Sequence, residues 1–229
     1  MKNKSVLTPP YKNNGFTLAE TLITLVIIGV IAAITVPTLI TKYQKEQTVT
    51  RLKKAYSALA QTTNRAIMDY GPVKTWEITD EGSAEASKTF VNKYMIPYLS
   101  ILKAPLTLQE GNYDTTVYAL NGEERHYGDN KIRFYLSDGT SITVEKENEY
   151  RMVLYIDING DKKPNKWGKD IFQINYYTNS GKLLFSGSAS SRGTLLSSQT
   201  HNCNKATTGL YCGALILKDG WRIADDYPW

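Results

Sequence analysis

A short loop in the second half of the chain has the spacing of a cation-binding loop. Asp157, Asn159 and Asp161 place oxygen-bearing side chains at alternate positions of the string DINGD, which is how the calcium loop of an EF-hand begins. The remainder departs from that pattern, because Lys162 stands where the turn glycine belongs and Gly168 where the bidentate acid would be. The loop also contains more lysines than acids, which opposes binding of a dication. A calcium site and an Asx-stabilised turn between two strands are therefore both left open.

Groups that could do catalysis are sparse. His126 and His201 are the only histidines, and neither has a recognisable nucleophile or metal partner nearby in the sequence. Glu123 and Glu124 are adjacent, which is more typical of the solvated end of a hairpin than of an acid–base pair. The sequence contains no glycine-rich phosphate loop. We therefore predict no enzymatic activity, and the alternative would be a membrane-anchored hydrolase.

Two cysteines, Cys203 and Cys212, lie nine positions apart in a stretch rich in Ser, Thr and Asn. In a chain whose bulk leaves the cytoplasm, such a pair predicts a local disulfide, and the alternative is two free thiols in a reducing compartment. A disulfide closing so small a loop would stabilise the fold by about 2.5–3 kcal/mol. A zinc site is not predicted, because zinc needs three or four ligands and His201 is the only further ligand nearby.

The secondary structure of the chain begins with a long apolar run near the N-terminus. Residues Leu22–Ile40 contain no charge over nineteen positions, enough to cross a bilayer core of about 30 Å as a helix. An acid, Glu20, stands at the edge of this run, and Lys12 is the nearest cation before it. An unpaired carboxylate at bilayer depth costs several kcal/mol, so Glu20 requires a cationic partner.

The string Gly15-Phe16-Thr17-Leu18-Ala19-Glu20, followed at once by the apolar run, resembles the prepilin signature of type IV pilins and type II secretion pseudopilins. The resemblance implies that a prepilin peptidase cuts after Gly15 and methylates the new N-terminal residue, Phe16. It also implies that Glu20 pairs with the Phe16 amine of a neighbouring subunit during assembly. One departure is that Asn13 and Asn14, and not a basic pair, precede the glycine.

Two other interpretations of the N-terminus were weighed. A Sec signal peptide would also have a basic start and an apolar core, with cleavage near Ala32. A plain signal anchor would explain the hydrophobicity and leave the GFTLAE string as a coincidence. The position of Glu20 at the head of the apolar run and an n-region of about twenty residues argue against the signal peptide, and the unexplained GFTLAE string argues against the plain anchor.

The resemblance also implies a location and partners. The chain would cross the bacterial inner membrane once with its head outside the cytoplasm, and then enter a filament in the periplasm or at the cell surface. Its partners would be other pilin or pseudopilin subunits, the prepilin peptidase, an assembly platform protein and a motor ATPase, besides membrane lipid.

The distribution of charge does not favour nucleic acid as a partner of the head. The chain has a formal net charge of +5, but residues 71–229 contain 18 basic and 19 acidic side chains. The basic excess lies in residues 1–15 and in residues 41–70, beside the apolar run, where a collar facing lipid headgroups is expected.

The pattern predicts an α+β fold in which a long N-terminal helix packs on an antiparallel β-sheet head. The leader is expected at 1–15, a transmembrane and filament-core helix at 16–40, an amphipathic helical stem at 41–70 and a globular head at 71–229. Gly71-Pro72 should stop the helix.

Within the head, a second helix at 84–103 should bend at Pro97, and later segments predict strands. The strands are expected at Val117–Leu120, Ile132–Leu136, Ser141–Glu145, Arg151–Asp157, Ile171–Tyr177 and Lys182–Phe185. Ser186–Gly209 is predicted as an exposed loop, and the aromatic end Trp221–Trp229 as packed in the core or in a subunit contact.

Three functions remain open on the sequence alone. A type IV pilin would form the surface filament, or fimbrium, used for adhesion, motility or DNA uptake. A type II secretion pseudopilin would form a short piston inside the envelope. A minor pilin would act as an adhesive or binding module, with aromatic side chains such as those at Trp221–Trp229 gripping a ligand. The sequence favours a pilin or minor pilin over a pseudopilin, because the head is larger than many major pseudopilin heads and ends in the predicted disulfide and an aromatic cluster.

Overall fold

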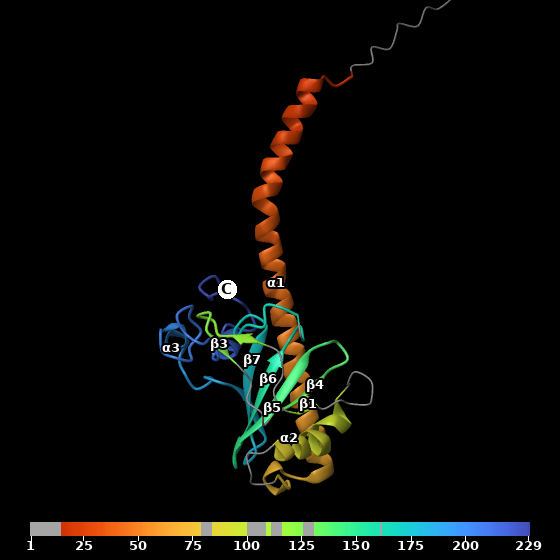
Figure 1. Cartoon of the computed structure of the whole chain (residues 1–229), viewed down its shortest axis with the longest axis vertical. Coiled ribbons are helices and arrows are strands. Elements are labelled where there is room, and N and C mark those ends of the chain that lie inside the picture. Colours follow the sequence, from red (N-terminus) through yellow and green to blue (C-terminus); the bar gives the residue numbers. More distant parts are fainter. Residues whose placement is uncertain (1–14, 79–83, 100–108, 111–115, 126–130, 161) are drawn as a thin grey trace, which may run out of the picture. The chain divides into compact units, whose positions relative to one another are not determined.

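The computed structural model describes residues 15–78, 84–99, 109–110, 116–125, 131–160 and 162–229. The chain divides into two compact units, the first ending at Gln44 and the second beginning at Lys45. The second unit contains the sheet and every helix after α1, and it is called the head below (Figure 1).

The longest element is helix α1 (Leu18–Tyr70), which contains the predicted apolar run and the amphipathic segment after it. Pro37 lies inside α1 without ending it. The helix stops where the sequence predicts. Gly71 adopts the left-handed conformation with φ of 78° and donates its N–H to the carbonyl of Ile67 at 2.9 Å, and Pro72 cannot continue the helical hydrogen bonds.

The head is built on an antiparallel sheet of six strands in the order β1-β4-β5-β6-β7-β8. The strands are β1 (Gln109–Glu110), β4 (Lys131–Tyr135), β5 (Ser141–Asn148), β6 (Arg151–Asp157), β7 (Ile171–Tyr177) and β8 (Lys182–Phe185). A separate two-stranded sheet pairs β2 (Val117–Tyr118) with β3 (Glu124–Arg125). The predicted α+β class is confirmed, and β6, β7 and β8 have the predicted bounds.

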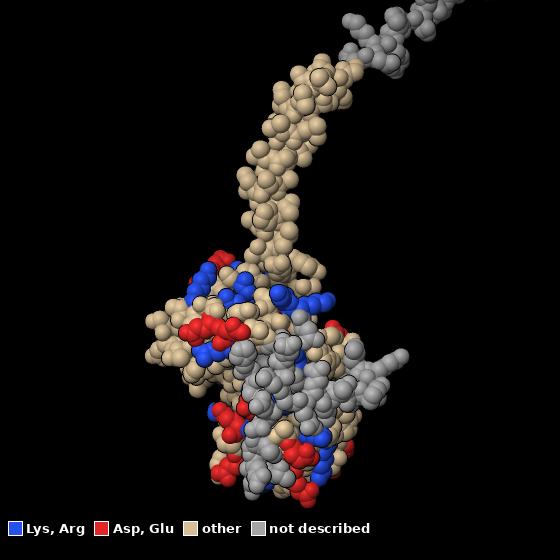
Figure 2. All heavy atoms as spheres, in the orientation of Figure 1, with Lys and Arg blue, Asp and Glu red and all other residues tan. Residues whose placement is uncertain are grey.

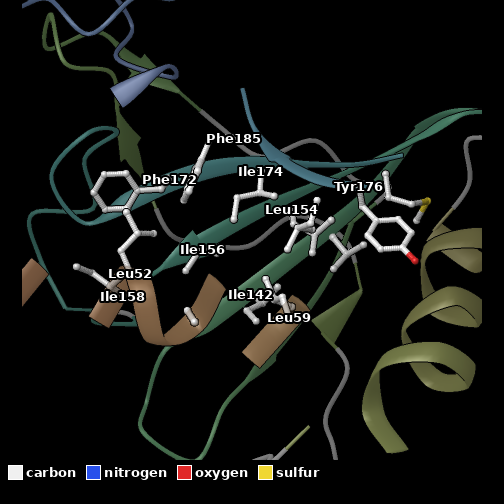
Figure 3. Packing of buried hydrophobic residues seen from close by; sticks show 14 of the residues in the cluster. Leu52, Leu59, Ile142, Leu154, Ile156, Ile158, Phe172, Ile174, Tyr176 and Phe185 are labelled. Carbon is white, nitrogen blue, oxygen red and sulfur yellow. The ribbon is translucent and has the colours of Figure 1, made fainter. Parts of the chain in front are cut away.

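The second half of α1 buries its apolar stripe against this sheet. Leu52, Ala55, Leu59 and Ala66 are at most 2% exposed and recur at three-, four- and seven-residue steps, which places them on one face of the helix. Figure 3 shows Leu52 and Leu59 facing apolar side chains that project from the strands. These side chains come from alternate positions of each strand and include Ile142, Val144, Leu154, Ile156, Phe172 and Ile174.

The outer edge of β8 is closed by hydrogen bonds from neighbouring segments. The Tyr56 hydroxyl of α1 donates to the carbonyl of Leu183 at 3.0 Å. The carbonyl of Phe185 accepts from the backbone N–H of Ser188 at 3.1 Å and from its hydroxyl at 2.6 Å. These carbonyls are therefore already paired without another strand.

Short helices cover the far end of the sheet, beyond the end of α1 (Figure 1). They are η1 (Val73–Thr75), α2 (Ala84–Phe90), the π-helical turn η2 (Val91–Met95) and the 3-10 turn η3 (Ile96–Tyr98). Their aromatic side chains form a cluster in which the Trp76 and Tyr94 rings stack with centroids 4.2 Å apart. The predicted helix at 84–103 thus changes hydrogen-bonding pattern before Pro97, as expected for a residue that lacks an N–H. Residues 100–103 lie outside the described part of the chain.

The segment predicted as an exposed loop, Ser186–Gly209, is instead partly buried and contains helix α3 (Arg192–Leu196). Leu195 packs in the core, and the backbone of Thr208 pairs with that of Leu120 at 2.9 Å. A run of small polar residues can be buried here because its hydroxyls and amides find backbone partners. Helix α4 (Cys212–Lys218) follows, and its residue Gly213 lies against the ring of Phe185 in β8.

Candidate functional site

The resemblance to prepilins places function in the first turn of α1, where Thr17 and Glu20 bond reciprocally. The Thr17 hydroxyl and backbone N–H both donate to Glu20 Oε2 at 2.8 Å. In return the Glu20 N–H donates to Thr17 Oγ1 at 3.2 Å. This is a capping box, in which two backbone donors at the start of a helix are satisfied by side chains. The box fixes the carboxylate at the N-terminal end of the helix.

The predicted processing residues lie directly before this box. Gly15 and Phe16 precede the first helical residue, and the Phe16 side chain is 88% exposed. No heavy atom lies within 4 Å of the position that a Cβ on Gly15 would occupy. The bond between Gly15 and Phe16 thus lies outside regular secondary structure, directly before the helix. Residues 1–14, the remainder of the predicted leader, lie outside the described residues.

The apolar run after the box has no protein surface to pack against within its own unit. Every residue in Leu22–Ile40 is exposed except Ala32, which is half-buried. Threonine hydroxyls in the run bond back to the helix, as in Thr35 Oγ1 to the Ile31 carbonyl at 2.9 Å, so these groups need no water. Among the described residues α1 is the one helix with the length and composition to cross a membrane.

The loop predicted as a calcium site or a turn is held by its carboxylates. Asp170 accepts from the backbone N–H groups of Asn165 at 2.9 Å and Lys166 at 2.5 Å, and from the Asn159 amide at 3.2 Å. Burial raises the pKa of Asp170, and the same hydrogen bonds partly offset that rise. Asp157 is 3% exposed and accepts from the Asn159 N–H at 3.2 Å.

These contacts match the turn more closely than the cation site. The Asp157 carboxylate lies 3.7 Å from the guanidinium of Arg133, which already supplies positive charge. Asp161 lies outside the described residues, and no group of three or more His, Cys, Asp or Glu side chains in the described part could hold a metal ion. The calcium site at Asp157, Asn159 and Asp161 stays a prediction.

The predicted disulfide is present. Cys203 and Cys212 are bonded to each other, and both are at most 1% exposed. The bridge is packed closely, because a Cβ on Gly168 would lie 2.7 Å from Cys212 Sγ. The bridge therefore joins the segment before α4 to the first residue of α4, and it packs against the loop that Asp170 organises.

An arginine clamp, which the sequence analysis did not identify, holds the C-terminal segment. The Arg192 guanidinium contacts the Asp219 carboxylate at 2.5 and 3.0 Å and the Asp226 carboxylate at 2.8 and 2.9 Å. The partners are 27 and 34 residues away in sequence, so no local pattern could reveal them. The capping box could have been found, since Thr17-Leu18-Ala19-Glu20 has its sequence pattern.

The remaining candidates for chemistry do not converge. His201 is exposed and its ring Nδ1 lies 3.4 Å from the Thr208 hydroxyl, whereas His126 lies outside the described residues. Glu123 pairs with Arg125 at 2.5 Å across an exposed hairpin end. In the part of the chain that is described, these groups surround no common position where a substrate could react.

Comparison with known families gives two matches that together cover most of the chain. Residues 10–36 match the prokaryotic N-terminal methylation motif. Residues 38–229 match a family of unknown function, DUF6613. No curated protein and no solved structure matches the chain. The motif covers the capping box and the exposed apolar run as far as Val36, and the second match covers the end of that run and the head. The chain therefore belongs to the DUF6613 family, and its N-terminal methylation motif is the prepilin-type signature, which supports a type IV pilin or pseudopilin family.

Proposed function

We propose that this chain is a structural subunit of a type IV pilus or pilus-like filament, cut after Gly15 and methylated at Phe16. The observation that carries the proposal is the apolar surface of Leu22–Ile40, exposed at every residue but Ala32, directly after the Thr17–Glu20 box. A helix that is apolar on every face is stable in lipid or in a bundle of similar helices. A filament subunit needs both environments, the first before assembly and the second after it.

The geometry of the capping box supports an assembly role for Glu20. Both hydrogen bonds that the Glu20 carboxylate accepts from Thr17 fall on Oε2. The second oxygen, Oε1, would accept from the methylated amine of Phe16 on a neighbouring subunit without breaking the box. Thr17 would thus hold the carboxylate in position before its partner arrives, and the ion pair would remove an uncompensated charge from an apolar bundle.

The head has features that favour a pilus subunit over a type II secretion pseudopilin. Its compact unit spans residues 45–229, and a buried disulfide and a packed aromatic segment lie near its C-terminal end. Stability of the head that depended on calcium would favour the pseudopilin, and saturable binding to a glycan would favour an adhesive minor pilin. In each case the prepilin peptidase, a platform protein and a motor ATPase in the inner membrane would act on the chain.

The intact mass of the protein from native cells tests the proposal. We expect a chain that begins at methylated Phe16 in filaments sheared from the cell surface. The same processed chain confined to membranes would favour a pseudopilin or a rare minor subunit. A chain that still begins at Met1, or one cut near Ala32, would contradict the proposal.

Two glycine variants separate processing from folding. Gly15→Leu is expected to block the cut, because the peptidase must accommodate the new side chain while the chain itself has open space there. Gly29→Ala is the matched control, since Gly29 also has no neighbour within 4 Å and lies inside the run that the peptidase leaves intact. Processing of both variants to the same extent would show that the cut is elsewhere.

A further inference from the structure

The end of the head at which α1 enters carries exposed basic side chains from separate segments of the chain. Helix α1 contributes Lys53, and the loop between β6 and β7 contributes Lys162, Lys163 and the half-exposed Lys169. Figure 2 shows Lys and Arg side chains gathered on the head where α1 enters it. The sequence alone placed a basic excess in residues 41–70, but it did not join that excess to the loop.

Contacts within the head bring these segments together with two tryptophans. Lys53 Nζ lies 5.9 Å from the centre of the Trp221 ring, and Lys169 Nζ lies 5.5 Å from that of Trp229. The start of the loop is tied to α1 by a hydrogen bond from Arg51 to the Ile158 carbonyl at 3.3 Å. The basic–aromatic surface is defined here as Lys53, Lys162, Lys163, Lys169, Trp221 and Trp229.

Most acids near the basic–aromatic surface are neutralised or buried. Asp157 and Asp170 are at most 4% exposed, and their hydrogen bonds within the head are described above. Asp138 pairs with Lys54 at 2.7 Å, and Asp226 pairs with Arg192. Among the described residues, the exposed acids near this surface are Glu46, Asp225 and the paired Asp226. The described side chains therefore leave an excess of positive charge there.

We propose that the basic–aromatic surface binds the anionic phospholipid headgroups of the leaflet from which the head emerges. The inference rests on the proposed membrane anchor. The apolar run ends at Ile40 and the head begins at Lys45, so the chain between them spans at most about 18 Å however the two units are oriented. Lysine and tryptophan are the side chains enriched at the headgroup level of a bilayer.

This surface gives the subunit a second attachment to the membrane besides its anchor. Each cation near an anionic surface strengthens binding by roughly fivefold, so several acting together would keep the head close to the bilayer before assembly. Extraction into a filament would break these contacts. An acidic face of another macromolecule could also satisfy the lysines, but the tryptophans and the short connection to the apolar run favour lipid.

Lysine labelling of the full chain in nanodiscs tests the proposal. The discs contain either phosphatidylcholine alone or phosphatidylcholine mixed with phosphatidylglycerol, and an acylating reagent is read out by mass spectrometry. We expect labelling of Lys162 and Lys163 to fall several-fold in the anionic discs and to recover in high salt. Lys74 and Lys182 serve as internal controls, because they lie at the opposite end of the head, where Gly181 packs against Val73.

A charge-reversal pair makes the test specific. In a triple variant that carries Lys53→Glu, Lys162→Glu and Lys163→Glu, Lys169 should no longer be protected from acylation in anionic discs. The matched variant Lys74→Glu, Lys182→Glu and Lys205→Glu changes the net charge equally at exposed positions elsewhere and should retain this protection. Near-ultraviolet circular dichroism confirms that both variants fold.

The outcomes separate the lipid surface from the proposed function. If the chain inserts into discs but its lysines are labelled equally in both lipids, the proposed lipid binding by the basic–aromatic surface is wrong. The proposed membrane anchor is then unaffected. A chain that does not enter discs at all would overturn both. Protection of the same lysines by duplex DNA in phosphatidylcholine discs, without any effect of phosphatidylglycerol, would assign the surface to nucleic acid and contradict the proposal.

Discussion

The backbone of Gly213 in α4 lies directly against the ring of Phe185 at the end of β8. A Cβ at position 213 would overlap Phe185 Cδ1 and come within 2.8 Å of Cε1. Phe185 is 1% exposed and also stacks on Tyr56 with ring centroids 5.3 Å apart, so its ring has no free direction in which to move. The absence of a side chain at 213 is thus what allows α4 to pack on the sheet.

Gly213→Ala should destabilise the protein by about 1–3 kcal/mol, because the added methyl group overpacks a filled core. Gly193→Ala in α3 is the control. Gly193 has no neighbour within 4 Å, and alanine there should stabilise the short helix by up to about 1 kcal/mol. Urea unfolding of the full chain in detergent measures both changes. Equal effects at the two positions would show that contact with Phe185 is not the cause.

Removal of the disulfide by Cys203→Ala and Cys212→Ala together should lower the free energy of unfolding by about 2–3 kcal/mol. Because both sulfurs are buried, a reductant without denaturant should leave the bond intact, and the same reductant in urea should cleave it. Thiol labelling followed by mass spectrometry distinguishes these states. Rapid reduction of the native protein would contradict the observed burial.

Asp170→Asn should destabilise the head by about 2–3 kcal/mol, because an amide nitrogen replaces an oxygen that accepts backbone N–H groups and one donor is left unpaired. Asp225→Asn is the control at an exposed acid, with an expected change within about 0.5 kcal/mol. The midpoint of urea unfolding reports both.

Urea unfolding of the unmodified chain, with calcium or with a chelator, tests the calcium prediction. Since Asp157 and Asp170 already have partners inside the head, we expect neither calcium nor a chelator to move the unfolding midpoint of the unmodified chain. A midpoint that rises with calcium and returns with the chelator would assign the loop to a dication.

Acid should weaken the arginine clamp. The hydrogen bonds from Arg192 hold the pKa of Asp226 below its usual value of 3.8. An acid whose pKa is lowered by folding contributes stability above the unfolded pKa, and that contribution is lost as the pH falls through the lower, folded value. Below pH 4 the unmodified chain should therefore lose stability more steeply than Asp226→Asn. Parallel losses measured by thermal unfolding would exclude a contribution from this pair.

Glu20→Gln should leave cleavage after Gly15 intact and reduce the yield of filaments by roughly tenfold or more, because the neighbouring amine loses its anionic partner. Thr17→Ser retains the hydroxyl of the capping box and should assemble almost normally, whereas Thr17→Val should assemble less well. Sheared filaments and membrane fractions, compared by immunoblot, measure assembly and processing separately. Normal filaments from Glu20→Gln would contradict the assigned role.

Much of the fold could be predicted because its signals are local. Gly71-Pro72 ends α1 where the amphipathic pattern ends, and strands β6 and β7 are mostly buried runs with β-branched and aromatic residues, bounded by turn residues. The course of Ser186–Gly209 could not be predicted, because its polar residues are buried by partners far away in sequence, such as Leu120. Arg192 was overlooked for the same reason.

In the candidate site, too, features that depend on local spacing could be predicted, and contacts between distant segments could not. Gly15, Phe16 and Glu20 could be predicted as processing and assembly residues because the prepilin signature depends on spacing along one segment. For the loop at Asp157, the sequence could not distinguish a calcium site from an Asx-stabilised turn. Spacing does not show which protein groups already pair with a carboxylate. The Arg133 guanidinium comes from another strand, and only the folded sheet brings it to Asp157.

The closed edge of β8 has a consequence for the proposed filament subunit, whose heads would be packed at high density. An open edge strand invites pairing between neighbouring chains and growth of a continuous cross-β aggregate. Tyr56 and Ser188 already occupy the carbonyls through which such pairing at β8 would begin. Strand pairing between neighbouring heads along this edge would therefore have to displace hydrogen bonds that each head already makes.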